Sequence, residues 1–105
     1  MSITARELIQ LLKTGQPDVI DVRDEDFSGF KIRGALNIPS ESFVQRMDSL
    51  DRNKEYVVHC MFSQVRGPAA CKCLIEKGFK ARLLVGGVQG FLQVDTEREF
   101  VEIIN

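Results

Sequence analysis

A cysteine and an arginine six positions apart are the residues of this chain best suited to chemistry. Cys60 and Arg66 follow an apolar run and precede a predicted helix. A thiol attacks electrophiles as its thiolate, and the N–H groups of a helix N-terminus together with a nearby arginine favour that charged form. The spacing therefore marks Cys60 as a candidate nucleophile and Arg66 as its cationic partner.

The segment between these two residues has a length suited to binding an anion. It consists of Met61, Phe62, Ser63, Gln64 and Val65. Its backbone N–H groups can curl around a tetrahedral oxyanion, and Arg66 can then bind two of the oxygens at once. Such an assembly supports covalent transfer of a phosphate-like group. The alternative is a buried cysteine at the end of a strand, beside a solvent-exposed arginine.

The residues that follow Arg66 are expected to support the loop. Gly67 and Pro68 come next. Pro68 suits the first position of a helix that runs to about Lys77, and Gly78 suits the position just past its end. This helix would direct its unpaired N–H groups back towards the loop.

Three other residues with reactive side chains are given structural roles. His59 is the only histidine; adjacent residues on a strand point to opposite faces, so we expect it to brace the loop through backbone hydrogen bonds rather than act as a base for Cys60. Cys71 and Cys73 lie roughly 200° apart around a helix, so they form no joint metal site or disulfide. We expect Cys71 in the core and Cys73 facing outward; resolving an oxidised Cys60 is the alternative role.

A general acid would complete the chemistry, and three carboxylates are candidates. Asp24, Glu25 and Asp26 follow a predicted strand, so their loop can lie at the same edge of the sheet. We expect these to be solvated loop carboxylates, and the sequence leaves the identity of the acid open.

Composition limits the remaining possibilities. The 105 residues fit one domain spanning 1–105, and 14 Lys+Arg against 15 Asp+Glu give a net charge of −1. No net field favours nucleic acid or an acidic membrane surface, and no apolar run reaches the roughly 20 residues of a membrane span. Three cysteines without a secretory signal fit a reducing compartment. We expect a cytoplasmic protein, with the nucleus as a second location.

Periodicity predicts alternating strands and helices. The expected strands are 18–22, 35–38, 56–59 and 81–85, with a long loop at 23–34. The expected helices are 4–14, 40–50, 68–77, 88–94 and 95–105, the second capped by Ser40 and the last placing Phe100, Val101 and Ile104 on one face. This order predicts an α/β fold, with a mostly parallel sheet of about five strands and helices on both faces. Ligands of such sheets bind at the carboxyl ends of the strands.

Two further motifs carry a resemblance to a known family. The segment IDVRDEDFSGFKIRGALNIPS, residues 20–40, resembles the first signature of the rhodanese-fold superfamily, and LLVGGVQGF, residues 83–91, resembles the second. The resemblance spans nearly the whole chain. It implies the rhodanese fold and does not choose the chemistry.

The length of the cysteine loop distinguishes branches of this superfamily. Rhodanese sulfurtransferases usually have four residues between the cysteine and the last position of the loop, and this chain has five. The segment HCMFSQVRGP, residues 59–68, is similar to the His-Cys-x5-Arg loop of M-phase-inducing dual-specificity phosphatases and eukaryotic arsenate reductases. The resemblance implies that Cys60 is the nucleophile, Arg66 the oxyanion clamp and 61–65 the cradle. Substrates would be phosphate, arsenate or a phosphorylated molecule. No bound cofactor is implied; glutathione and glutaredoxin would be co-reductants for arsenate.

Departures from the family and two alternatives complete the expectations. Met61 and Val22 stand where the cell-cycle phosphatases carry a glutamate and a back-door cysteine, so their protective disulfide is not expected. The absence of a long regulatory region favours the small arsenate-reductase-like proteins. The alternatives are a sulfurtransferase carrying a persulfide on Cys60, and a binding module without catalysis.

Overall fold

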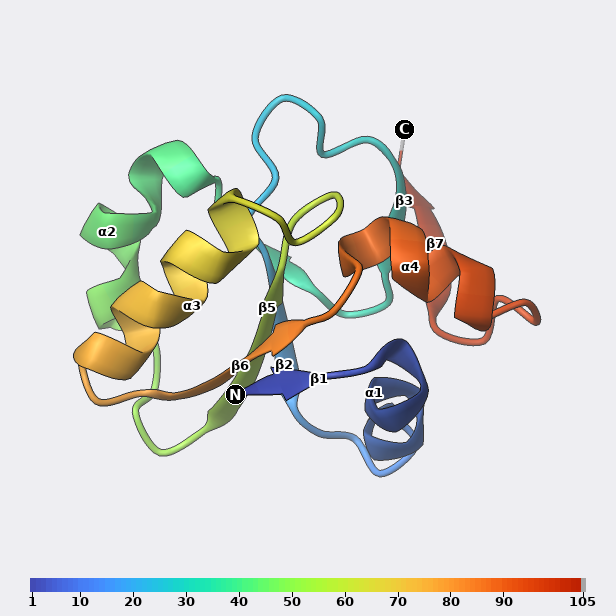
Figure 1. Cartoon of the computed structure of the whole chain (residues 1–105), viewed down its shortest axis with the longest axis horizontal. Helices are drawn as coiled ribbons and strands as arrows, with labels where there is room; N and C mark the ends of the chain where they lie inside the picture. Colours follow the sequence, from blue (N-terminus) through green and yellow to red (C-terminus); the bar gives the residue numbers. More distant parts are fainter. Residues whose placement is uncertain (105) are drawn as a thin grey trace.

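A computed structural model describes residues 1–104 and places a five-stranded parallel sheet at the centre of the molecule (Figure 1). The strands lie in the order β1-β6-β5-β2-β4. Their bounds are Ser2–Ile3 for β1, Asp18–Asp21 for β2, Leu36–Asn37 for β4, Glu55–His59 for β5 and Lys80–Leu84 for β6. Each strand is short, and β5 is central.

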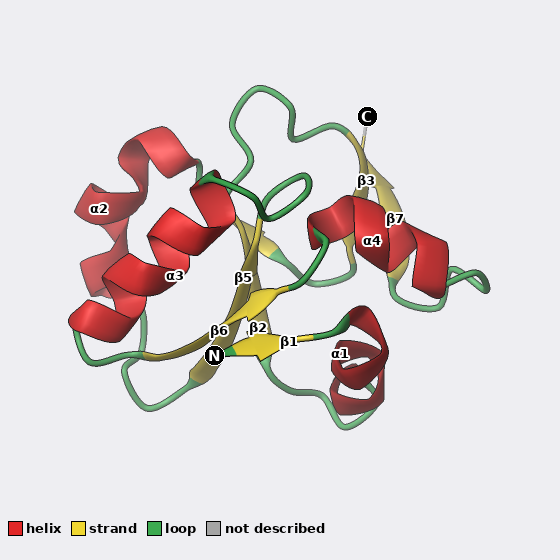
Figure 2. Ribbon diagram, in the orientation of Figure 1, coloured by secondary structure: helices red, strands yellow, loops and turns green. Residues whose placement is uncertain are grey.

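Helices cover both faces of this sheet (Figure 2). One face carries α1 (Ala5–Leu12) and α4 (Gly87–Val94), and the other carries α2 (Phe43–Arg46) and α3 (Arg66–Glu76). Consecutive strand residues point to opposite faces, so Val57 packs in the core beneath α1 and α4 and Val58 in the core beneath α2 and α3. The predicted fold class is confirmed. No helix within residues 1–104 is long and apolar enough to cross a bilayer.

A second, two-stranded sheet corrects two expectations. β3 (Gly29–Ile32) pairs antiparallel with β7 (Val101–Ile104). The loop predicted for 23–34 therefore contains a strand, and the helix predicted for 95–105 is wrong; Asn105 lies outside the described residues. The spacing of apolar residues in so short a run fits either a helix or a strand. Pairing with β3 favours the strand.

Two predicted helices have different bounds. The segment 40–50 is broken into 3₁₀ turns at Ser40–Ser42 and Met47–Ser49 that flank the single turn of α2. Its predicted cap is wrong, because the Ser40 hydroxyl donates to Asp24 at 2.6 Å. The helix after the cysteine begins at Arg66, which puts Pro68 third rather than first.

The remaining helix boundaries follow local chemistry. Thr4 and Glu7 form the predicted capping box of α1, with bonds of 3.1 and 2.9 Å. Gly78, just beyond α3, has a φ of +87° as predicted. These ends fix where the chain enters and leaves the sheet.

Candidate active site

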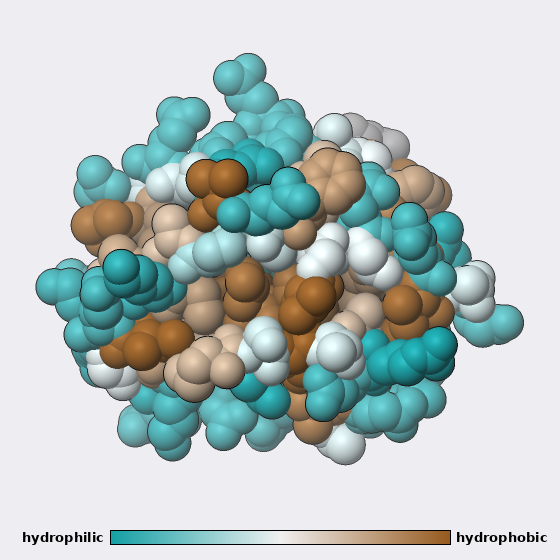
Figure 3. Space-filling view, in the orientation of Figure 1, coloured by the Kyte–Doolittle hydropathy of each residue, from teal (hydrophilic) through white to brown (hydrophobic). Residues whose placement is uncertain are grey.

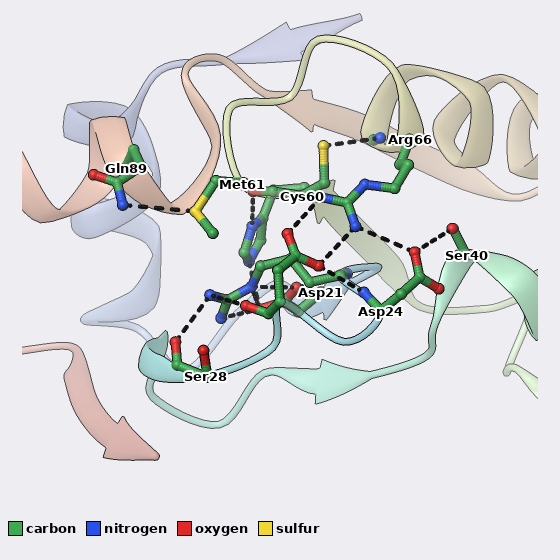
Figure 4. Close-up of polar contacts among 12 residues, drawn as sticks. Asp21, Asp24, Ser28, Ser40, Cys60, Met61, Arg66 and Gln89 are labelled. Carbon is green, nitrogen blue, oxygen red and sulfur yellow. Dashed lines mark hydrogen bonds and ion pairs between the residues drawn. The ribbon is translucent and has the colours of Figure 1, made fainter. Parts of the chain in front are cut away.

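The loops that follow β2 and β5 lie side by side at the carboxyl edge of the sheet. The two strands are parallel neighbours, with Asp21 opposite His59 at their last positions. The chain then continues into the carboxylate loop (residues 22–28) and the cysteine loop (residues 60–66). Figure 4 shows side chains from both loops meeting at this edge.

Cys60 lies at the base of the cysteine loop. The residue is only 4% exposed, and its Sγ accepts the backbone N–H of Gly67 at 3.2 Å. This N–H belongs to the first turn of α3, so the helix N-terminus faces the sulfur. Partial positive charge at a helix N-terminus stabilises a thiolate. The structure thus places the candidate nucleophile where sequence predicts.

The carbonyl groups at the start of the loop face α4. Those of Cys60 and Met61 accept the N–H groups of Val88 and Gln89, each at 3.1 Å. Gly87 allows this approach: its φ is +62°, and a Cβ there would lie 2.5 Å from both carbonyl oxygens. In a trans peptide the N–H points opposite to the C=O, so the N–H groups of Met61 and Phe62 point away from α4.

The N–H groups of the cysteine loop have no protein acceptor. Within residues 1–104, no backbone N–H from 61 to 66 donates a hydrogen bond. Ser63, with a φ of +55°, has a buried hydroxyl that also lacks a partner in this described part of the chain. Polar groups at such positions ordinarily find a partner in protein, water or ligand. The loop is therefore chemically suited to an anion.

Arg66 contacts two of the three carboxylates considered as acids. Its Nη1 and Nη2 donate to Asp26 Oδ1 and Oδ2 at 2.7 and 2.6 Å, and Nη1 also donates to Asp24 Oδ2 at 3.2 Å. The hydrogen bond from Arg66 lowers the pKa of Asp26 to about 2. The expectation of three solvated carboxylates is wrong for these two and holds for Glu25, which is exposed.

Comparison with known proteins decides the family. The rhodanese-like domain matches residues 4–93, most of the chain. The chain belongs to the rhodanese-like family. The match agrees with the motifs at residues 20–40 and 83–91.

Relatives of this rhodanese-like domain carry different activities in their names. The chain is 45% identical to the dual specificity phosphatase ibp1 of Schizosaccharomyces pombe over 62 residues, which are 55% of this chain and 45% of that protein. It is 38% identical to the putative sulfurtransferase YtwF of Bacillus subtilis over 70% of this chain and 71% of YtwF. Arsenate reductase 2.2 of Oryza sativa is 33% identical over 70% of this chain and 61% of its own length.

A solved structure shows the same fold. The rhodanese-related protein of Thermoplasma volcanium superposes with a TM-score of 0.80 at 29% identity, over 90% of this chain and 92% of that one. The chain spans less than half of ibp1 and about three fifths of the rice reductase.

His59 lies beneath the cysteine loop of the rhodanese-like domain. It is fully buried, and Nδ1 lies 2.9 Å from the carbonyl of Cys60, so Nδ1 carries the proton and donates. Nε2 lies 3.7 Å from Asp21. Burial lowers the pKa of His59 despite this carboxylate. A neutral histidine bonded to a backbone carbonyl fits the bracing role predicted from sequence.

An apolar groove adjoins Arg66, and its lining includes Ser40, which donates to Asp24 of the carboxylate loop. Its volume is about 270 Å³, and its lining is formed by Ser40, Phe43, Val44, Val65, Arg66, Ala69, Ala70 and Cys73. Cys73 is thus half-buried in this lining rather than outward, whereas Cys71 is buried in the core as predicted. Figure 3 shows hydrophobic side chains reaching the surface among hydrophilic ones on the face that carries α3.

Sequence reasoning missed two features of the site. The pairing of Asp24 and Asp26 with Arg66 had no signal beyond a run of acidic residues, since it joins positions about 40 apart. The contact of Gly87 with the cysteine loop had one: two consecutive glycines after a strand indicate close backbone approach. Within residues 1–104, no three His, Cys, Asp or Glu side chains are arranged to hold a metal ion.

Proposed function

We propose that the protein is a cysteine-dependent enzyme that acts on tetrahedral oxyanions, with Cys60 as nucleophile and Arg66 as the oxyanion clamp. One observation carries this proposal. The backbone N–H groups of 61–66 have no acceptor within residues 1–104, next to a thiol that already accepts an N–H from α3. Fixed donors of this kind stabilise charge on an oxyanion in the transition state.

As a phosphatase, the enzyme would act in two steps. The Cys60 thiolate attacks phosphorus, the bond from phosphorus to the leaving oxygen breaks, and that oxygen takes a proton. Water then attacks the thiophosphate, the S–P bond breaks, and phosphate leaves with the thiolate regenerated. The dual specificity phosphatase ibp1 supports this form of the proposal.

As an arsenate reductase, the enzyme would use the same first step on arsenic. The thiolate attacks arsenate, and one oxygen leaves as water after protonation. A glutathione thiol then attacks the Cys60 sulfur, the S–As bond breaks with its electron pair left on arsenic, and arsenite leaves a disulfide between Cys60 and glutathione. A second glutathione, with glutaredoxin, reduces this disulfide, so that two glutathione thiols supply the two electrons and the Cys60 thiol is regenerated. The rice arsenate reductase supports this form.

The apolar groove favours phosphomonoesters as the first substrates to test. It begins at Arg66 and continues along apolar side chains such as Val44 and Val65. An organic group that extends from an anion at Arg66 into this groove would bury apolar surface there, which is favourable. Inorganic arsenate has no such group.

A sulfurtransferase is the second candidate function. The chain covers 71% of YtwF, a putative sulfurtransferase, against 45% of ibp1 and 61% of the rice reductase. In this form Cys60 attacks the outer sulfur of a donor such as thiosulfate, sulfite leaves, and the persulfide is passed to a nucleophile. The five residues between Cys60 and Arg66 make a larger loop than sulfurtransferases usually have, which favours a phosphate-like oxyanion as substrate.

Parallel assays on one preparation separate these activities. An aryl phosphate, arsenate with glutathione and glutaredoxin, and thiosulfate with cyanide are each offered to the wild-type protein. We expect turnover of the aryl phosphate or of arsenate, lost in Cys60→Ser and reduced about 10²-fold in Arg66→Lys, because lysine cannot form the bidentate contact. Cys71→Ala, at a core cysteine that lies outside the groove and the cysteine loop, is the matched control and keeps activity. Turnover of thiosulfate alone would contradict the proposal.

A further inference from the structure

The carboxylates beside Arg66 have a geometry that assigns them a role. Asp26 binds the outer edge of the guanidinium through both oxygens, and Asp24 binds the remaining hydrogen of Nη1. Figure 4 shows Asp24 and Ser40 on one side of Arg66 and Cys60 on the other. Asp24 and Ser40 therefore lie across the guanidinium from the candidate nucleophile.

The contacts leave one edge of the guanidinium for an anion. Arginine has five N–H donors in a planar fork. Three are used by Asp24 and Asp26, and the other two, on Nε and Nη2, share the second edge. Within residues 1–104, Nε of Arg66 has no hydrogen-bond partner. A bidentate contact with an oxyanion can thus form without breaking the contact with Asp26.

Asp24 and Asp26 are themselves held in place. Asp24 Oδ2 accepts the Ser40 hydroxyl at 2.6 Å, and its Oδ1 accepts the N–H of Glu41 at 3.1 Å. The Asp24 N–H donates to Asp26 Oδ1 at 3.0 Å. The side chain of Arg23, buried beneath them, donates to the Asp26 carbonyl. The carboxylates are thus positioned before any anion binds.

Proton transfer does not suit Asp26 in this position. Its pKa is lowered to about 2, chiefly by the hydrogen bond from Arg66. Burial works to raise the pKa of Asp24, but bonds from Ser40, Glu41 and Arg66 together lower it. Both groups therefore carry negative charge at neutral pH, and a general acid must carry a proton.

We propose that Asp26, supported by Asp24, is a positioning residue that holds Arg66 with its Nε edge directed at the oxyanion. The inference rests on the proposed function and extends it. Two other roles make different predictions. A general acid would protonate the leaving group, and a competing carboxylate would have to leave Arg66 before the anion bound.

The test compares Asp26→Asn with wild type on an aryl phosphate and on orthovanadate as a phosphate mimic. We expect kcat/KM and vanadate affinity to fall together by about 10-fold or more, since the clamp loses its orientation. The basic limb of the pH profile of kcat keeps its position. Asp26→Glu restores part of the loss. Glu25→Gln, which changes the exposed neighbour, leaves both quantities within about 2-fold.

A double-mutant cycle keeps the test decisive if Asp26→Asn is less stable. Because the carboxylate acts through Arg66, Asp26→Asn should have little further effect on vanadate affinity in an Arg66→Ala background. An additive loss there would contradict the inference.

Other outcomes overturn it in recognisable ways. Loss of the basic limb with unchanged affinity would make Asp26 the general acid, and tighter vanadate binding would make it a competitor. Wild-type protein that binds no vanadate and turns over no oxyanion would overturn the proposed function as well. Wild-type binding that Asp26→Asn leaves unchanged would overturn this inference alone.

Discussion

The carboxylate loop and the cysteine loop leave adjacent strands at the same edge of the sheet, yet their polar groups are used in opposite ways. In the carboxylate loop, the buried Arg23 binds Asp21 at 2.8 Å and donates to the carbonyls of Asp26, Ser28 and Phe30. In the cysteine loop, successive N–H groups have no acceptor within residues 1–104. The first loop is stabilised from within the protein, whereas we propose that the donors of the second bind an oxyanion.

This difference explains how one edge can be both rigid and reactive. A run of N–H donors without acceptors lowers the stability of the fold, so the surrounding structure must hold the loop in place. The carbonyl groups of Cys60 and Met61 are held by α4, and Arg66 is held by Asp24 and Asp26. The cysteine loop is thus supported on two sides by groups outside it.

The largest effect is expected from the nucleophile. Cys60→Ser should lower turnover by at least about 10³-fold, because a serine hydroxyl is a much weaker nucleophile than a cysteine thiol. Its circular dichroism spectrum should match that of wild type. Retained turnover would show that the cysteine loop is structural, like the carboxylate loop.

The buried cation of the carboxylate loop should dominate stability. Arg23→Met removes one partner of a pair in which Asp21 is fully buried. Leaving that charge unpaired should lower the free energy of unfolding by about 3–5 kcal/mol, measured by urea denaturation. Lys54→Met, at the exposed pair with Asp18, is the comparison and should change it by less than about 1 kcal/mol. Equal losses would remove the distinction between the loops.

The contact between α4 and the cysteine loop should be sensitive to one methyl group. Gly87→Ala would place Cβ 2.5 Å from two carbonyl oxygens, so the loop must shift. We expect a loss of about 1–3 kcal/mol in stability and about 10²-fold in kcat/KM. Gly15→Ala is the matched control, with a φ of +88° and no atom within 4 Å of the new Cβ. It has backbone strain alone and should keep its activity.

The smallest effect is the pH dependence of the Arg66 contact. The folded-state pKa of Asp26 is lowered to about 2, so its ion pair stabilises the fold fully above pH about 5 and loses this contribution as pH falls towards 2. The difference in unfolding free energy between wild type and Asp26→Asn should be below about 1 kcal/mol near pH 6 and vanish near pH 2. A difference that persists at pH 2 would show that another interaction is involved.

Local patterns in the sequence predicted most of the sheet and the position of the nucleophile. Each predicted strand has a counterpart, because short apolar runs bounded by glycine, proline and polar residues favour buried strands. The capping box at Thr4 likewise fixed the start of α1. The strand β7 was missed, since its pairing with β3 joins residues about 70 apart and leaves no local signal.

The candidate site was predicted only in part, again because some of its contacts join residues that are far apart in the sequence. Cys60 and Arg66 are close in sequence, and the loop between them has a recognisable length. Asp24 and Asp26 reach Arg66 only through the parallel pairing of β2 with β5. Their hydrogen bonds to Arg66 then depend on side-chain placement that no spacing rule describes.

Titration of ¹⁵N-labelled protein with orthovanadate tests the central claim most directly, that the cysteine loop binds an oxyanion through its N–H groups. We predict saturable changes in the amide signals of residues 61–67 and in the Nε signal of Arg66, with the carboxylate loop little affected. Cys60→Ser should retain these changes, since the backbone donors remain. Saturable binding elsewhere, or no change in the amides of 61–67, would contradict the account.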